Sequence, residues 1–214
     1  MVAKHALIGT MMLVAAGCTA AHHSNPDRMD APAPSNTLET SAYNYLLSTP
    51  AALEHYKACI MLGELPPDPA ILGDARQRLN APHTTDTDAR LCLQYLLAKK
   101  SGRPEDMQRF VMEYPTGAAY SHLLELHAHS GYLLGMMPPM TDLLVQHILL
   151  TGDMTALQKL LAGLPYADGA HAESLTDALA HVYRRYPARV EHAFDVAKIP
   201  GNTRTLIVQK SQLR

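Results

Sequence analysis

The sequence contains no tryptophan and only two phenylalanines, and charged residues occupy just 18% of its 214 positions. Leucine, alanine, methionine and tyrosine must therefore fill its core. The low charge, together with 47% apolar residues, excludes a disordered chain. The formal net charge of −2 excludes nucleic-acid binding driven by bulk positive charge, so we expect no nucleic-acid partner. Because β-branched residues are sparse while strong helix formers abound, the composition favours helices.

Motifs of nucleophilic and nucleotide chemistry are also missing. The chain has no Gly-x-Ser-x-Gly, no Ser-x-x-Lys, no phosphate-binding glycine loop and no dinucleotide fingerprint. Cys59 and Cys92 lie in no local catalytic signature. We therefore expect neither an enzyme nor a cofactor.

The most apolar stretch, residues 6–17, is too short to span a bilayer. At ~1.5 Å per residue it reaches about 18 Å, whereas a hydrocarbon core is about 30 Å thick. It follows Lys4, as the apolar region of a secretory signal follows its basic start. The sequence therefore predicts a signal peptide over residues 1–17.

This stretch ends in small residues followed by a cysteine, Leu13-Val14-Ala15-Ala16-Gly17-Cys18. The pattern resembles the lipobox of bacterial lipoproteins, although Ala15 stands where that family prefers leucine. The resemblance implies cleavage before Cys18, a diacylglyceryl group on its thiol and an acylated new amino terminus. Several acyl chains would hold the protein permanently on a membrane. Thr19 replaces the aspartate that retains such lipoproteins at the inner membrane, so the resemblance favours the outer membrane, facing the periplasm.

Residues 18–40 are rich in proline and small polar residues, which predicts a disordered, lipidated tether. From residue 41 onwards, apolar residues recur at three- and four-residue spacing, which predicts a helical domain over 41–200. The expected helices span 41–48, 51–64, 69–79, 86–100, 104–114, 117–134, 138–150, 153–163, 171–186 and 188–198.

The predicted helices repeat with a period of about 50 residues. Residues 101–115 match residues 151–165 at an offset of 50, each with a Ser-Gly or Thr-Gly helix stop, an apolar helical face and a closing proline. Residues 45–47 match 95–97 at the same offset, and residues 58–66 match 107–115 at an offset of 49. The fold class expected from this pattern is all-α, with helical hairpins stacked as a short α-solenoid. The body weakly resembles tetratricopeptide-type repeats, which bind proteins, but their 34-residue period and signature are missing.

Charge is unevenly placed along the chain. Residues 18–183 carry an excess of eight negative charges, whereas residues 184–214 carry an excess of five positive ones. This basic end either contacts an anionic partner or docks on the acidic body of its own chain. Residues 201–214 are expected to form a basic tail, in which 203–210 is either a strand offered to another sheet or a frayed end.

Histidines invite a metal hypothesis. His122, Glu125 and His129 share one face of a predicted helix, and two imidazoles with a carboxylate are a possible zinc triad. Their spacing along the axis is long for one ion, so they are weak candidates and no metal site is assigned. Glu173, Asp177 and His181 share one face of another predicted helix. This face is best interpreted as a row of solvated polar side chains rather than a catalytic site.

Two cysteines remain if Cys18 is lipidated. An even pair in an oxidising compartment predicts a disulfide between Cys59 and Cys92, whereas the alternative is two buried, reduced thiols. The bridge would close a loop of about 34 residues. By lowering the conformational entropy of the unfolded chain, it would stabilise the folded state by roughly 3–4 kcal/mol.

Three functional hypotheses follow. The first is a lipid-anchored periplasmic scaffold that binds another cell-envelope protein, in a secretion, conjugation, pilus or cell-wall assembly. The second is a surface-exposed lipoprotein acting on a host or the environment. The third is a metal- or ligand-binding module using the histidine-rich helix 122–129.

Overall fold

The computed structural model describes residues 37–81, 86–131 and 137–213, and every regular element in those ranges is a helix. The predicted all-α fold is confirmed, and each of the ten expected ranges contains a helix, although the one expected over 117–134 ends at His129. The elements are α1 (Thr37–Ser48), α2 (Ala52–Glu64), α3 (Pro69–Asn80), α4 (Thr87–Lys100), α5 (Pro104–Glu113), α6 (Ala118–His129), α7 (Pro139–Thr151), α8 (Met154–Gly163), the short 3-10 helix η1 (Leu164–Tyr166), α9 (Gly169–Arg185), α10 (Pro187–Val196) and α11 (Gly201–Gln212).

Local side-chain chemistry sets the helix boundaries. Asp68, Asp86 and Asp153 each accept hydrogen bonds from backbone N–H groups in the first turn of the helix they precede, as N-cap residues do. Proline begins α3, α5, α7 and α10, where a missing N–H costs nothing. Gly152 ends α7 in the left-handed conformation, with a φ of 69°, which glycine adopts without steric cost.

The 50-residue period contains three helices rather than a hairpin. The first helices of successive copies begin at residues 37, 87 and 139, the second at 52, 104 and 154, and the third at 69, 118 and 169. The matched stretches found in the sequence cover parts of the first helices α1 and α4 and of the second helices α2, α5 and α8, but only the last residue of α7. The sequence match missed the equivalence of α3, α6 and α9, which share their order in the repeat but differ in length, with 12, 12 and 17 residues.

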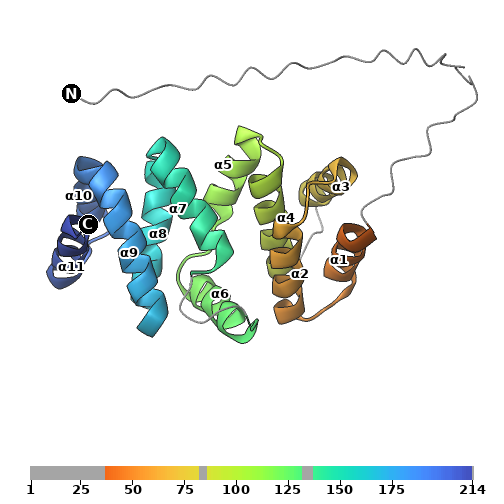
Figure 1. Ribbon diagram of the computed structural model, residues 1–214, viewed down its shortest axis with the longest axis horizontal. Helices are drawn as coiled ribbons and strands as arrows, with labels where there is room; N and C mark the ends of the chain where they lie inside the picture. Colours follow the sequence, from red (N-terminus) through yellow and green to blue (C-terminus); the bar gives the residue numbers. More distant parts are fainter. Residues whose placement is uncertain (1–36, 82–85, 132–136, 214) are drawn as a thin grey trace, which may run out of the picture. The chain divides into compact units, whose positions relative to one another are not determined.

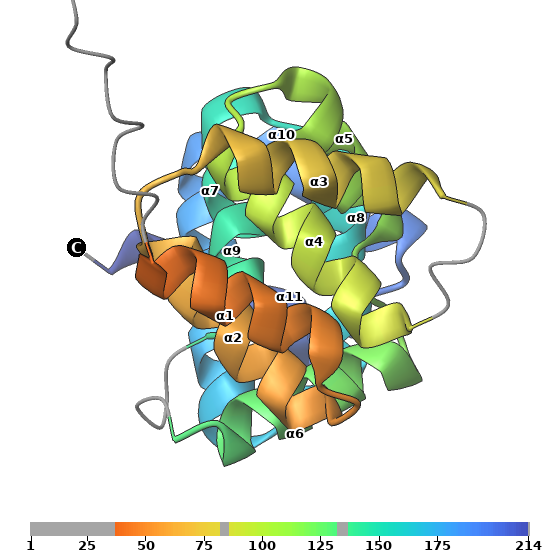
Figure 2. The ribbon, with the colours of Figure 1, turned by 90° about the vertical axis from the view of Figure 1, so that its right-hand side faces the viewer.

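The helices of residues 35–214 stack side by side in one unit (Figure 1). The first two helices of each copy pack against each other, α2 packs on α4, α5 on α8, and α8 on α10. The third helices go to different places, since α3 packs on α4, α6 contacts α2, and α9 packs against α7 and α11. Figure 2 shows α3 and α6 on opposite sides of α4 and α2. The stack is therefore solenoid-like but not regular.

Tyrosine and phenylalanine take the place of the missing tryptophan in the core. The rings of Tyr95, Phe110, Tyr114 and Tyr120 form a chain of contacts with centroids 5.6–6.3 Å apart, and all four side chains are buried. Tyr120 lies so close to Gly163 that a Cβ there would be 2.8 Å from the ring. This aromatic chain links α4, α5, α6 and α8 in the centre of the stack.

Two expected boundaries at the ends of the domain are corrected. Helix α1 begins at Thr37, inside the segment predicted as a tether, and its Glu39 is buried and accepts a hydrogen bond from the backbone N–H of Asp68. The predicted tail contains helix α11, so residues 203–210 are neither a strand nor a frayed end. Buried Ile207 anchors α11, and tertiary burial outweighs the strand propensity of the Leu206-Ile207-Val208 run.

The basic carboxyl-terminal region docks on its own chain. Arg189 donates to the carbonyl of Gly152, Arg204 binds Asp195, and Lys210 binds Asp177 at 2.5 Å. The structure thus shows docking on the body for Lys210, which pairs with its Asp177, and for Arg189, which binds a backbone carbonyl there. Arg204 pairs with Asp195 inside the basic region itself.

The predicted signal peptide, Cys18 and most of the tether lie outside the described residues. Within the described ranges, no helix has the length and apolar character needed to cross a membrane.

Candidate functional site

An open groove runs between α7 and α9. One wall is the face of α7 formed by Asp142, Val145 and Leu149, at positions i, i+3 and i+7, with Met137 just before the helix. The other wall is one face of α9, and the described residues that line it are Ser174, Asp177, Ala178 and His181. We call this site the α7–α9 groove.

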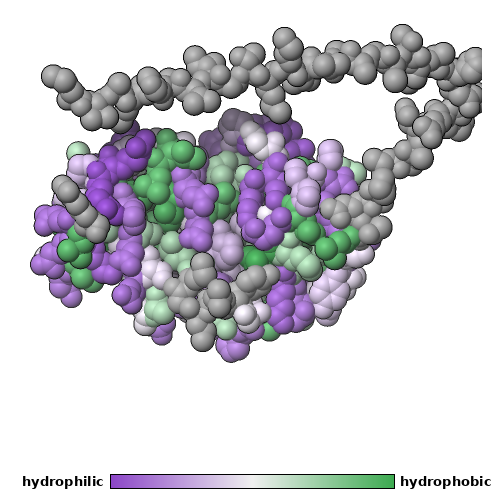
Figure 3. Space-filling view, viewed as in Figure 1, coloured by the Kyte–Doolittle hydropathy of each residue, from purple (hydrophilic) through white to green (hydrophobic). Residues whose placement is uncertain are grey.

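The floor and flanks of the α7–α9 groove are apolar. Val145 and Ala178 are buried, and Met137 and Leu149 are partly buried against the core. At the carboxyl end of α7, Leu150 is 80% exposed, and Figure 3 shows apolar surface gathered over this part of the helix. Such a strip rimmed by polar groups is typical of a surface that receives another molecule.

Asp142 is the unusual group in this groove. Its side chain is half-buried, and no hydrogen bond or ion pair joins its carboxylate to a described residue. Burial raises the pKa of Asp142 above its ordinary value, while the charge of Lys99 acts in the opposite direction. The carboxylate has thus lost part of its hydration without forming an ion pair with a described residue.

The polar groups of the α9 wall are occupied from within the chain. Asp177 forms its ion pair with Lys210 of α11, and Arg184 donates to Nδ1 of His181 at 2.8 Å. The sequence interpretation of this face was a solvent-exposed row of polar side chains. In the structure the Asp177 carboxylate and the His181 imidazole are exposed, and each contacts a cation of the same chain.

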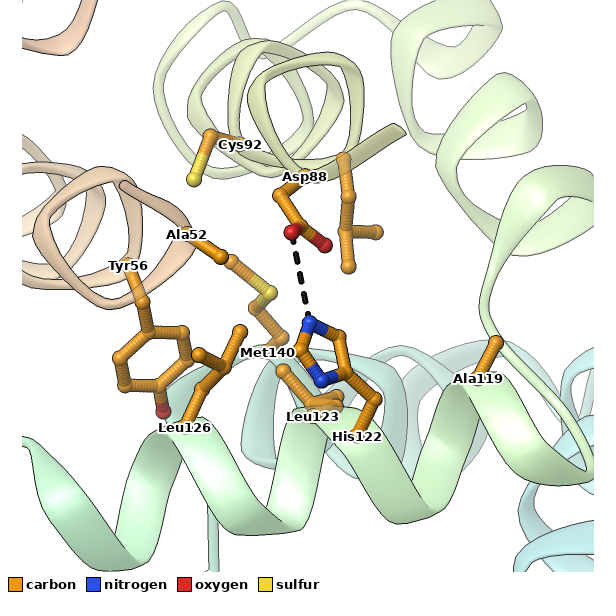
Figure 4. A pocket seen from close by; sticks show the side chains of 10 residues that line it. Ala52, Tyr56, Asp88, Cys92, Ala119, His122, Leu123, Leu126 and Met140 are labelled. Carbon is orange, nitrogen blue, oxygen red and sulfur yellow. Dashed lines mark hydrogen bonds and ion pairs between the residues drawn. The ribbon is translucent and has the colours of Figure 1, made fainter. Parts of the chain in front are cut away.

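A second, smaller cavity contains residues singled out in the sequence (Figure 4). It lies between α2, α4, α6 and α7 and has space for about one water molecule. His122 and Asp88 stand at its edge, joined Nε2 to Oδ2 at 3.3 Å, and the remaining lining is mainly apolar, with Tyr56 and Met140 among its residues. The cavity is too small for a substrate.

The metal hypothesis for His122, Glu125 and His129 is not supported. His122 turns towards Asp88, and Nδ1 of His129 donates to the backbone carbonyl of Glu125 at 2.7 Å. Among the described residues, no three His, Cys, Asp or Glu side chains are grouped so that they could hold a metal ion. Helical geometry explains the outcome, because His122 and His129 are two turns apart and point to different neighbours.

Cys59 and Cys92 are buried free thiols, so the predicted disulfide is not formed in the structure. The Cys92 thiol donates to the backbone carbonyl of His55 at 3.4 Å. Burial, with a smaller contribution from the neighbouring Cys59 thiol, raises the pKa of Cys92 well above its ordinary value. The alternative of two buried cysteines that act as small apolar residues describes the site better.

We expect neither thiol to react in the native protein, because the thiolate is the reactive form and both side chains are shielded. The native chain, treated with iodoacetamide without reductant, should show Cys59 and Cys92 unmodified by mass spectrometry. After unfolding in urea, still without reductant, both should be alkylated. Failure of both to react in the unfolded chain would show a disulfide after all.

Comparisons with protein-family models, with curated proteins and with solved structures found no match. The site is therefore interpreted from its own geometry.

Sequence reasoning missed Asp142. The available signal was the one acidic residue in the mainly apolar stretch from Met140 to Leu150, on the same helical face as Val145 and Leu149. That no described residue pairs with it depends on where α4 and α11 place their lysines, and this is not readable from the sequence.

Proposed function

We propose that this protein is a lipid-anchored, non-enzymatic helical scaffold on the periplasmic side of the outer membrane that binds another cell-envelope protein. The observation that carries the proposal is the α7–α9 groove, an open apolar strip that includes a half-buried carboxylate with no ion pair to a described residue. The lipobox resemblance at Cys18 supports the anchor and the compartment.

The groove is supported on both sides by packed helices. Helix α7 packs on α8 and α9, and α9 packs on α10 and α11. Tyr186, directly after α9, donates to the carbonyl of Leu149 at 3.1 Å and so ties the two walls together. A binding surface on rigid helices loses little entropy when a partner docks.

In-cell crosslinking tests the proposal. A photoreactive amino acid at exposed His181, which lines the groove, should produce one discrete adduct with an envelope protein in native cells. The same amino acid at Met112, 59% exposed on α5, is the control and should produce none. If position 181 forms no adduct, or only the smear also seen from position 112, the scaffold function is wrong.

The anchor makes a separate prediction. Cys18→Ser removes the thiol that would receive the lipid, so we expect the chain to leave the membrane fraction or to remain uncleaved. Fractionation after a high-salt wash, with immunoblotting, measures this. A Cys18→Ser chain of mature size that stays with the membrane would contradict the lipid anchor.

A further inference from the structure

The carboxylate of Asp142 forms no ion pair with a described residue, because the described cations around it are engaged elsewhere. Lys99, whose charge reaches Asp142, binds Glu64 at 2.6 Å and the hydroxyl of Tyr95 at 3.1 Å. Lys210 is bound by Asp177 on the opposite wall. A partly buried carboxylate that forms no ion pair loses hydration free energy, and the charge of Lys99, which is paired with Glu64, offsets only part of that loss.

A neighbouring pocket, between α9 and α11, shows how a basic side chain can be received. Lys210 reaches from α11 to Asp177, and its stem lies partly buried beside α9. Long basic side chains bury their methylene groups on apolar surface while the charged end finds a carboxylate. Around Asp142, the apolar side chains of Met137, Val145 and Leu149 provide that surface.

We propose that the α7–α9 groove binds a protein segment in which a lysine or arginine stands among apolar residues, and that Asp142 receives the cation. This inference rests on the proposed scaffold function and names the chemistry of the partner. Charge complementarity at the groove supports it, because Asp142 is a half-buried carboxylate to which no described residue offers an ion pair or a hydrogen bond.

Arginine and lysine are distinguished from purely apolar partners by the energetics of the site. An apolar segment would cover Asp142 without pairing it, and would complete the removal of its water at further cost. A basic segment buries Asp142 as well, but its lysine or arginine donates a charge-assisted hydrogen bond to the carboxylate. The groove therefore selects against wholly apolar and acidic partners.

A selected peptide is the probe for this inference. A phage library of random 12-residue peptides is panned on the full chain in detergent, and the enriched peptides are synthesised with a fluorescent label. We expect them to share a lysine or arginine flanked by apolar residues. Fluorescence anisotropy should then show that the peptides bind Asp142→Asn with a dissociation constant at least about tenfold higher than that for the unmodified chain.

Two controls separate this site from general attraction. Glu125→Gln removes the same charge from an exposed position of α6 outside the groove and should leave the affinity unchanged. Replacing the basic residue of the peptide by methionine should weaken binding to the unmodified chain but not to Asp142→Asn, as expected for a direct pair. Asp142→Asn should unfold at the same or a slightly higher temperature, since it removes an unpaired, partly buried charge.

Each contrary result overturns the proposal. No enrichment on the unmodified chain, peptides without a basic residue, equal affinity for Asp142→Asn, or an equal loss with Glu125→Gln would each do so. Crosslinking separates this failure from that of the scaffold function. An adduct at position 181 that is unchanged by Asp142→Asn leaves the scaffold function standing and removes only the inference about the cation.

Discussion

Replacing Phe110 by alanine is expected to lower the free energy of unfolding by about 3–5 kcal/mol. Phe110 is completely buried in α5 and its ring contacts Tyr95 and Tyr114, with centroids 6.3 and 5.6 Å away. The substitution removes apolar area, leaves a cavity and breaks the aromatic chain that links α4 to α6 and α8. Since a domain of this kind is stable by roughly 5–15 kcal/mol, the loss is a large share of the total. Urea unfolding followed by circular dichroism measures it.

The matched control for this prediction lies on the same helix. Met112 is 59% exposed, so Met112→Ala should change the free energy of unfolding by no more than about 0.5 kcal/mol. Similar losses for the two variants would mean that α5 does not present Phe110 to the core.

Asp106→Asn is expected to cost about 2–3 kcal/mol at neutral pH. Asp106 is 6% exposed and accepts hydrogen bonds from Arg76 of α3 and from the hydroxyl of Ser101, each at 2.7 Å. Breaking a buried ion pair by removing one charge strands the other, although the partial exposure of Arg76 moderates the penalty. Glu105→Gln, at the exposed neighbouring position, should leave the unfolding midpoint unchanged within error.

The contribution of Asp106 should depend on pH in a defined direction. Burial alone raises the pKa of Asp106, but the hydrogen bonds from Arg76 and Ser101 outweigh it and hold the pKa below its ordinary value of 3.8. The stabilisation is therefore complete above about pH 4 and is lost as the pH falls through the lowered folded-state pKa. Urea midpoints from pH 7 to pH 2 should show the unmodified chain and Asp106→Asn converging at the acid end. A constant difference between them over this range would contradict the assignment.

The fold was largely readable from the sequence, whereas the candidate site was not. Helix positions followed from local signals, such as Asp86 before α4 and Gly152 after α7, which act within a few residues. The α11 helix was missed because its short β-branched run carries a local preference that burial of Ile207 overrides. Candidate ligands such as His122 and His129 were judged from one helix alone, while their partners are set by neighbouring elements.

The sequence by itself determined that the chain is helical, that its helices recur every 50 residues or so, and which faces of them are apolar. These properties depend on spacing and on capping residues, and both are local. Only the tertiary structure decided that α3 and α6 leave the stack on different sides, that Cys59 and Cys92 are free thiols, and that Asp142 faces a groove in which no described cation pairs with it. Those outcomes depend on contacts between residues far apart in the chain, and the packing of whole helices selects among the many pairings that the sequence pattern allows.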